Sequence, residues 1–284
     1  MTTHLRESAL EGRPPEGELV IDCHCHMGKW FNFHIPSGDA AGMVETMDML
    51  SVRCGIVSAH PGIGPDFRLG NSMALEAARR FPGRFFCYVA VNPNYPQQET
   101  ERELERLLSG ELFVGIKIHP DMHQHPADGP GYEPVWEAAS SRGCPVLCHT
   151  WDGSSHDPPQ KLAEIADRFP NAPLILGHCG GSIGGIEASI EAVRKQSGRP
   201  QNIYLDLAGS ALWSGRIERM VERAGAERIL FGTDLPFIDP RPQLGSVLMA
   251  AISDEDKRMI LGLNAAKLFG LEGKLGSNSP CSAR

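Results

Sequence analysis

Short apolar runs alternate with longer stretches of helical periodicity over most of the chain. Each run is rich in β-branched or aromatic residues and ends at Gly, Pro or a polar residue, as is typical of buried strands. The pattern predicts eight strands, at 18–26, 54–60, 84–93, 112–120, 144–150, 172–180, 203–210 and 228–236.

The segments between these runs place apolar residues at helical spacing, and several of them stop at Gly or Pro. Strands that alternate with helices imply right-handed crossovers and a parallel sheet. The number and length of the units favour a closed (β/α)8 TIM barrel over an open doubly wound sheet. The expected helices are at 39–51, 71–83, 97–110, 132–143, 158–170, 186–198, 216–228 and 254–270.

No long linker divides the chain, so one barrel domain is expected over residues 18–272. The first 17 residues are rich in Pro, Gly and Glu, and the last 12 are rich in Gly and Ser. Such compositions do not bury enough apolar surface to order a segment. We therefore expect flexible tails at 1–17 and 273–284.

Composition narrows the class of protein. Of the 284 residues, 41% are hydrophobic and 22% are charged, as in ordinary globular proteins. The formal net charge of -8, with no basic cluster, argues against a nucleic-acid partner. No apolar run approaches the roughly 20 residues that span a bilayer. The 8 cysteines include no CxxC pair and suggest reduced thiols, so a cytoplasmic protein is expected.

Histidines gather at the ends of the predicted strands. In a TIM barrel the chemistry lies at the carboxyl ends of the strands, so these side chains should meet on one rim. A buried imidazole is costly without a partner, and a metal ion would supply one. Residues two apart share a face of a strand, so we expect His24 and His26 in the lumen and Cys23 and Cys25 toward the helices. The strand-end residues are His24, His26, His60, Lys117, His119, His149, His178 and Asp234.

Five strand-end motifs, in order, resemble the amidohydrolase superfamily, in particular the amidohydrolase-related (amidohydrolase 2) branch of TIM-barrel metal-dependent hydrolases. They are IDCHCH, GIKIHP, PVLCHTWDG, FPNAPLILGHCGG and FGTDLP, and NAAKLFG after the last strand also fits. The resemblance covers roughly residues 20–270. It implies a TIM barrel with a metal-activated water.

The resemblance also implies roles for individual residues. His24, His26, His149 and Asp234 match metal ligands, and His178 is either a further ligand or a catalytic group; we expect it to be catalytic. Zn2+, or another divalent ion, accepts such ligands and acidifies a bound water. Asp234 would then take the proton of that water, and His178 would polarise the bond to be cleaved.

Lys117 leaves the number of ions open. A lysine on this strand is carboxylated and bridges two metals in some members of the superfamily. Alternatively, Lys117 stays unmodified and pairs with Asp234 or with a substrate carboxylate, which we favour. We therefore expect one ion per chain, and two if Lys117 is carboxylated. His119, two residues further on, would orient a ligand or hold substrate.

Other residues near the rim are candidates for contact with a small-molecule substrate, although surface or packing roles fit each of them as well. They are His60, Trp30, Arg68, Asp152 and Arg241.

The expected function is a hydrolase that cleaves a C–N or C–O bond (amide, lactone or ester) of a small molecule. The strand-four lysine favours this activity. The alternative is a lyase of the same family, a nonoxidative decarboxylase or a hydratase, because both classes share these ligands. A further alternative is a non-catalytic metal-binding protein. A homo-oligomer is compatible with the sequence, which does not specify one.

Overall fold

Eight parallel strands form one sheet in which each strand pairs with the next along the chain. The computed structural model describes residues 4–198, 201–209 and 213–275. The predicted strand residue 210 and the tail beyond 275 lie outside this part. The strands are β1 (Ile21–Met27), β2 (Cys54–Ala59), β3 (Phe85–Ala90), β4 (Phe113–Ile118), β5 (Val146–Trp151), β6 (Leu174–Gly180), β7 (Ile203–Asp206) and β8 (Ile229–Leu230).

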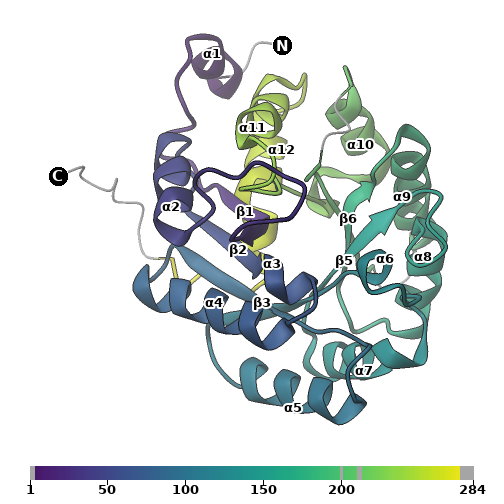
Figure 1. Ribbon diagram of the computed structural model, residues 1–284. Coiled ribbons are helices and arrows are strands. Elements are labelled where there is room, and N and C mark those ends of the chain that lie inside the picture. Colours follow the sequence, from purple (N-terminus) through teal and green to yellow (C-terminus); the bar gives the residue numbers. More distant parts are fainter. Residues whose placement is uncertain (1–3, 199–200, 210–212, 276–284) are drawn as a thin grey trace.

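Helices connect the strands and surround them on the outside (Figure 1). Their apolar faces turn inward: in α8, Leu162 and Ile165 are buried, whereas Glu164 and Asp167 are exposed. The helices are α1 (His4–Leu10), α2 (Ala40–Met49), α3 (His60–Ile63), α4 (Phe67–Arg80), α5 (Gln97–Leu108), α6 (Pro120–His123), α7 (Glu133–Arg142), α8 (Pro159–Arg168), α9 (Ile183–Lys195), α10 (Arg216–Ala224), α11 (Pro240–Met249), α12 (Asp254–Arg258) and α13 (Asn264–Leu268), with short turns η1 (Pro130–Tyr132), η2 (Ala226–Arg228) and η3 (Met259–Leu263).

The barrel closes between β1 and the segment that continues β8. The amide of Cys23 donates to the carbonyl of Phe231 at 2.9 Å, and the amide of Asp234 donates to the carbonyl of His24, also at 2.9 Å. Cys25 and Leu235 form a further parallel bridge. The predicted (β/α)8 TIM barrel is therefore confirmed, and its closing seam joins the two segments that carry His24 and Asp234.

The apolar core has two parts. The larger part packs the outer faces of the strands against the helices. The smaller part lies inside the barrel near the amino ends of the strands, where Ile21, Ile56 and Leu147 meet Phe269 just beyond α13. The last helices thus plug the end of the barrel opposite the histidines, which leaves the carboxyl end for chemistry.

Cys23 corrects one detail of the predicted strand alternation. Its side chain belongs to the interior cluster, whereas that of Cys25 packs in the outer core. The pairing of β1 with β2 shifts register between Asp22 and Cys25. A β-bulge of this kind breaks the period of two, and the prediction that both cysteines face the helices is wrong for Cys23.

The segments expected to be flexible carry some structure. Residues 4–10 form α1, which buries Leu5 and packs against α11. Leu275 is buried in the interior cluster. The helix α11 was not predicted, because Pro240, Pro242 and a glycine obscure its periodicity; Asp239 caps it by accepting from the amide of Arg241 at 3.0 Å.

Within the described residues, the helices are all too short or too polar to cross a membrane.

Candidate active site

His24, His26 and Asp234 meet at the closing seam of the barrel. The Nε2 atoms of His24 and His26 lie 3.3 and 3.5 Å from Oδ1 of Asp234. His178, at the end of β6, approaches the other oxygen, with Nδ1 3.3 Å from Oδ2. Three predicted site residues therefore converge on the carboxylate of a fourth, Asp234.

Each histidine of the HxH pair is held from behind by an acceptor. Nδ1 of His24 lies 2.5 Å from Oδ2 of Asp206, and Nδ1 of His26 lies 3.0 Å from the carbonyl oxygen of Ser58. These contacts place the proton of each ring on Nδ1, so that Nε2 carries the lone pair and faces Asp234. An outer acceptor that orients a ligating histidine in this way is typical of metal sites.

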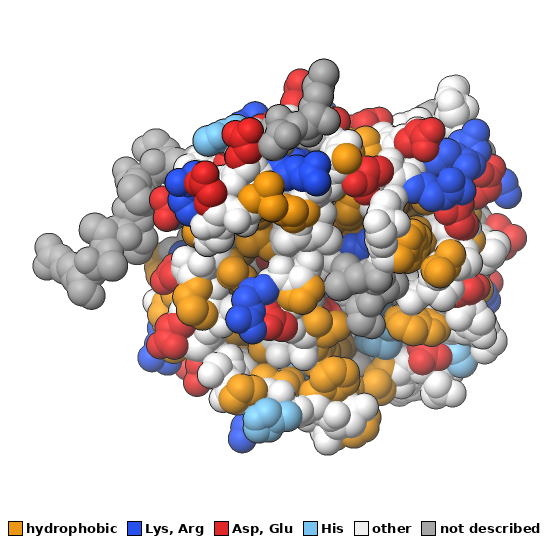
Figure 2. All heavy atoms as spheres, turned by 90° about the horizontal axis from the view of Figure 1, so that it is seen from above, with side chains coloured by type: hydrophobic (Ala, Val, Ile, Leu, Met, Phe, Trp, Pro, Cys, Tyr) orange, Lys and Arg blue, Asp and Glu red, His pale blue; other side chains and the backbone are white. Residues whose placement is uncertain are grey.

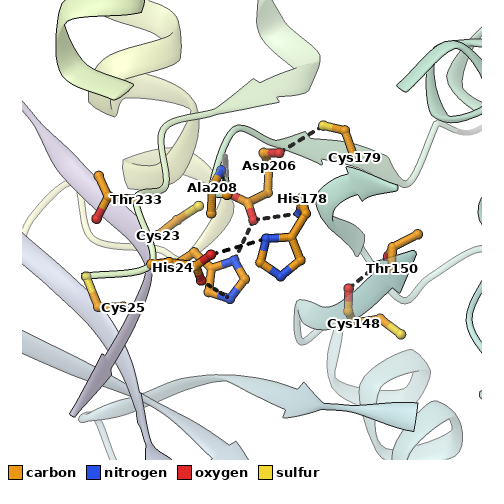
Figure 3. Close-up of polar contacts among 12 residues, drawn as sticks. Cys23, His24, Cys25, Cys148, Thr150, His178, Cys179, Asp206, Ala208 and Thr233 are labelled. Atoms are coloured by element: carbon orange, nitrogen blue, oxygen red, sulfur yellow. Dashed lines mark hydrogen bonds and ion pairs between the residues drawn. The ribbon is translucent and has the colours of Figure 1, made fainter. Parts of the chain in front are cut away.

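Asp206, at the end of β7, was missed in the sequence. It is fully buried and also accepts from the amide of His178 at 3.2 Å and from that of Ala208 at 2.9 Å (Figure 3). Burial would raise its pKa, but the interactions with His24, His178 and the amide of Ala208 together outweigh burial and lower it. Asp206 could have been identified in the sequence as the single acidic residue at the end of an apolar strand.

Asp22 supports the same seam from below. Its carboxylate accepts from the amides of His24 and Thr233, each at 3.1 Å, and from the hydroxyl of Thr233 at 2.5 Å. Burial raises the pKa of Asp22 to about 7. The two hydrogen bonds from Thr233 tie the strand that carries the histidines to the segment that carries Asp234.

Lys117 lies inside the cluster and not at its edge. Its Nζ is 2.9 Å from Nε2 of His24, and the side chain is buried. Burial lowers the pKa of Lys117, and the negative charges of Asp234 and Asp206 act in the opposite direction. These contacts do not distinguish an unmodified Lys117 from a carboxylated one, and they place its side chain beside the predicted metal ligand His24.

His149 and His119 extend the cluster along β5 and β4. Their rings stack face to face with centroids 3.9 Å apart, and the ring of His149 lies 4.9 Å from that of His178. His119 also caps α6, because its Nδ1 accepts from the amide of Met122 at 3.2 Å. The predicted strand-end histidines thus form one continuous group.

The electrostatics of the cluster fit a cation. Burial would raise the pKa of Asp234, but the interactions with His178, His24 and His26 hold it well below its usual range. Burial also lowers the pKa of His24, to about 4, so its imidazole is neutral at pH 7. Oδ1 of Asp234 and Nδ1 of His178 are buried without a hydrogen bond in the described residues. Neutral imidazoles around an ionised, unsatisfied carboxylate are the donor set of a divalent metal.

The backbone at this rim is strained. Asp234 and His178 have φ angles of 66° and 59°, in the left-handed region that residues other than glycine seldom adopt. Such a conformation persists only where the surroundings enforce it, and it is common at functional sites. In both residues it aims the side chain into the lumen.

Two of the candidate substrate contacts lie at the cluster. The ring of His60 is 5.2 Å from that of His26, and the ring of Trp30 is 5.3 Å from that of His60. Phe237, which the sequence analysis missed, lies 4.2 Å from His60 and 5.2 Å from His26. Its position three residues after Asp234 was the signal that could have identified it.

The other candidate contacts have partners elsewhere. The guanidinium of Arg68 pairs with Glu99 and lies over the ring of Tyr95. Asp152 accepts from the hydroxyl of Ser182 at 2.8 Å, and Arg241 pairs with Asp239 beside it in sequence. A role for these three in substrate binding remains a prediction.

A TIM barrel with imidazole and carboxylate donors at the carboxyl ends of its strands defines the class of metal-dependent barrel enzymes. Residues 21–271 match the family model described as Amidohydrolase, so the chain belongs to the amidohydrolase family. It is an enzyme of this superfamily, and the predicted family is confirmed.

Curated and structural relatives are decarboxylases. Gamma-resorcylate decarboxylase of Rhizobium radiobacter is 26% identical over 285 residues, which cover 83% of this chain and 86% of the relative. The crystal structure of 5-carboxyvanillate decarboxylase from Sphingomonas paucimobilis is similar with a TM-score of 0.70 at 17% identity, covering 89% of this chain and 99% of that chain. A further similar structure is the 5-carboxyvanillate decarboxylase of Novosphingobium aromaticivorans, complexed with manganese and 4-hydroxy-3-methoxy-5-nitrobenzoic acid. Its TM-score is 0.67 at 18% identity, and the match covers 90% of this chain and 97% of that chain.

These relatives correct the predicted reaction. The expectation of a hydrolase is wrong, because curated relatives that match most of the chain are gamma-resorcylate decarboxylases, which are lyases that break a C–C bond. The error has a chemical cause: hydrolases and decarboxylases of this family share the same metal ligands, and the strand-four lysine does not distinguish them.

Proposed function

We propose that the protein is a divalent-metal-dependent, nonoxidative decarboxylase of a small aromatic carboxylic acid. The observation that carries the proposal is the convergence of His24, His26 and His178 on Asp234, in a chain whose curated relatives are gamma-resorcylate decarboxylases. The aromatic side chains of Trp30 and Phe237 beside this cluster suit a planar substrate.

We place one ion here and assign it to His24, His26, His149 and Asp234, the ligands that the resemblance implies. Ligand atoms of His24, His178 and Asp234 lie within 4.8 Å of one another, which supports an ion at this seam. When bound, a divalent ion such as Zn2+ or Mn2+ would act as a Lewis acid that fixes and polarises the oxygen atoms of the substrate. Asp206 and Ser58 fix the outer nitrogens of the first two ligands, which leaves their Nε2 atoms aimed at the site.

The reaction requires one proton. The carbon that bears the carboxylate gains a proton, the bond to that carboxylate breaks, and its electron pair remains on the ring as CO2 leaves. We assign delivery of this proton to Nε2 of His178, because its Nδ1 faces Asp234 at 3.3 Å. The carboxylate of Asp234 orients the ring and stabilises the protonated imidazole, as an aspartate does for a general-acid histidine. Solvent then returns the proton to His178.

The formal net charge of -8 disfavours a nucleic-acid partner. In Figure 2, acidic and basic side chains intermingle across the face shown. A small molecule that enters the barrel is therefore the partner that the proposal requires.

A substrate panel tests the reaction. The metal-loaded protein should release CO2 from a hydroxybenzoate such as 2,6-dihydroxybenzoate or from 5-carboxyvanillate, with the matching phenol as product. The same preparation should leave simple lactones and amides intact. Release of acid from a lactone or amide, with no CO2 from any aromatic acid, would contradict the proposal.

Removal of the metal should abolish this activity. We expect about one Zn2+ or Mn2+ ion per chain, and loss of CO2 release after dialysis against a chelator, with recovery on adding either ion back. The melting temperature should also fall, because an ion at 100 times its Kd stabilises the folded state by about 2.7 kcal/mol. Elemental analysis and calorimetry measure both effects. Two ions per chain, with a mass increase on Lys117, would indicate a carboxylated lysine instead.

A further inference from the structure

The ring of His149 lacks the support that the other histidine ligands have. His24 is held by Asp206 at 2.5 Å and His26 by the carbonyl of Ser58 at 3.0 Å. Within the part of the chain that the structure describes, the ring of His149 stacks on that of His119 and makes no hydrogen bond. A ligating histidine normally donates its outer N–H to a carboxylate or carbonyl, so an acceptor for His149 is to be expected nearby.

Asp157 carries a buried carboxylate to which the proposed decarboxylation assigns no role. It lies in the loop between β5 and α8, and its side chain is fully buried. Neither oxygen completes a hydrogen bond in the described residues, although the nearby hydroxyl of Ser154 lowers its pKa. Leaving such a group unsatisfied is costly, so a donor is needed.

The backbone of this loop fixes Asp157 close to both stacked histidines. The carbonyl of Asp157 accepts from the amide of Trp151 at 3.3 Å, which ties the loop back to the end of β5. One carboxylate oxygen, one nitrogen of His119 and one nitrogen of His149 all lie within 4.8 Å of one another.

This trio could in principle hold a second ion, but His119 argues against it. Its Nδ1 accepts from the amide of Met122, so the ring proton lies on Nε2. A nitrogen that carries a proton is a donor and cannot bind a metal. Ligation would require the loss of the cap on α6.

We propose that Asp157 is a positioning residue that accepts hydrogen bonds from the outer N–H of His149 and from Nε2–H of His119, and so orients His149 as a ligand. The carboxylate has two oxygens and can serve both rings. The inference rests on the proposed metal site, and it gives His149 the kind of outer partner that Asp206 gives His24.

Metal affinity tests the inference. In a competition titration with Zn2+, Asp157→Leu should bind about 10- to 100-fold more weakly than the wild type, with one ion still bound at saturation. Asp157→Asn keeps one acceptor oxygen and should recover much of this loss. Asp128→Asn is the matched control, because Asp128 is an exposed partner of Lys161 at 2.7 Å. Equal affinity of Asp157→Leu and the wild type would overturn the inference.

A measurement on the wild type guards against a variant that fails to fold. In the Zn2+-loaded protein labelled with 15N-histidine, one ring N–H of His149 should be visible and slow to exchange with water. Rapid exchange of that proton would overturn the inference, as would the loss of one of two bound ions in Asp157→Leu. A wild type that binds no ion would refute the proposed function as well. If the wild type binds an ion and Asp157→Leu binds it equally well, only the role of Asp157 is refuted.

Discussion

Asp234→Asn should reduce decarboxylation by about 10³-fold or more, a loss in the range expected for removing acid–base catalysis. His24, His26 and His178 surround this carboxylate, each with a ring nitrogen within 3.5 Å of one of its oxygens. An amide removes the negative charge that stabilises protonated His178, and its NH2 group cannot bind a metal. The variant should therefore lose the bound ion together with its activity.

Steady-state CO2 release and metal content measure the two consequences separately. Asp128→Asn, which changes an exposed aspartate in the same way, should keep both. The assignment of Asp234 would be incorrect if Asp234→Asn kept its ion and more than about a tenth of the wild-type kcat, well above the loss expected for an acid–base group.

The fold could be predicted because its signals are local. Each buried strand is a compact apolar run, and each helix such as α8 carries its own periodicity. The missed helix α11 shows the limit, since Pro240 and Pro242 at its start remove the helical pattern while Asp239 still caps it. The side chain of Cys23 faces the barrel interior because β1 shifts register against β2. The sequence of β1 alone does not encode this shift.

The metal-binding cluster could be predicted in part. His24, His26, His178 and Asp234 end their strands, and the rule that parallel strands end on one rim brings them together. Asp206 obeys the same rule but was missed, because a single acidic residue in an apolar run is compatible with many different roles. Phe237 and Asp157 lie in loops, and their contacts with His60 and with the stacked histidines depend on how those loops fold.

The reaction could not be derived from the ligands at all. A metal with three imidazoles and a carboxylate can activate water or polarise a substrate acid, so the choice depends on what the pocket holds. Trp30 and Phe237 pack against each other beside the cluster, but neither ring specifies a reaction. The relatives, and not the motif, turned the prediction from hydrolysis to decarboxylation.

Asp206→Asn should weaken metal binding by about 10- to 100-fold and lower the free energy of unfolding by about 2–3 kcal/mol. Oδ2 of Asp206 accepts from Nδ1 of His24 and the amide of His178, and Oδ1 accepts from the amide of Ala208. Asparagine replaces one of these oxygens with an NH2 group. In either orientation, a donor then faces a donor at the centre of the barrel.

The two effects have distinct measurements, because they arise from different contacts of Asp206. Denaturant unfolding of the metal-free protein reports the lost hydrogen bonds, whereas a Zn2+ titration of the folded variant reports the misoriented ring of His24. Asp128→Asn again provides the control for a change of one charge. An unchanged Zn2+ affinity in Asp206→Asn, together with reduced stability, would limit Asp206 to holding β7 against β6. A loss of affinity at full stability would instead place its whole effect on the orientation of His24.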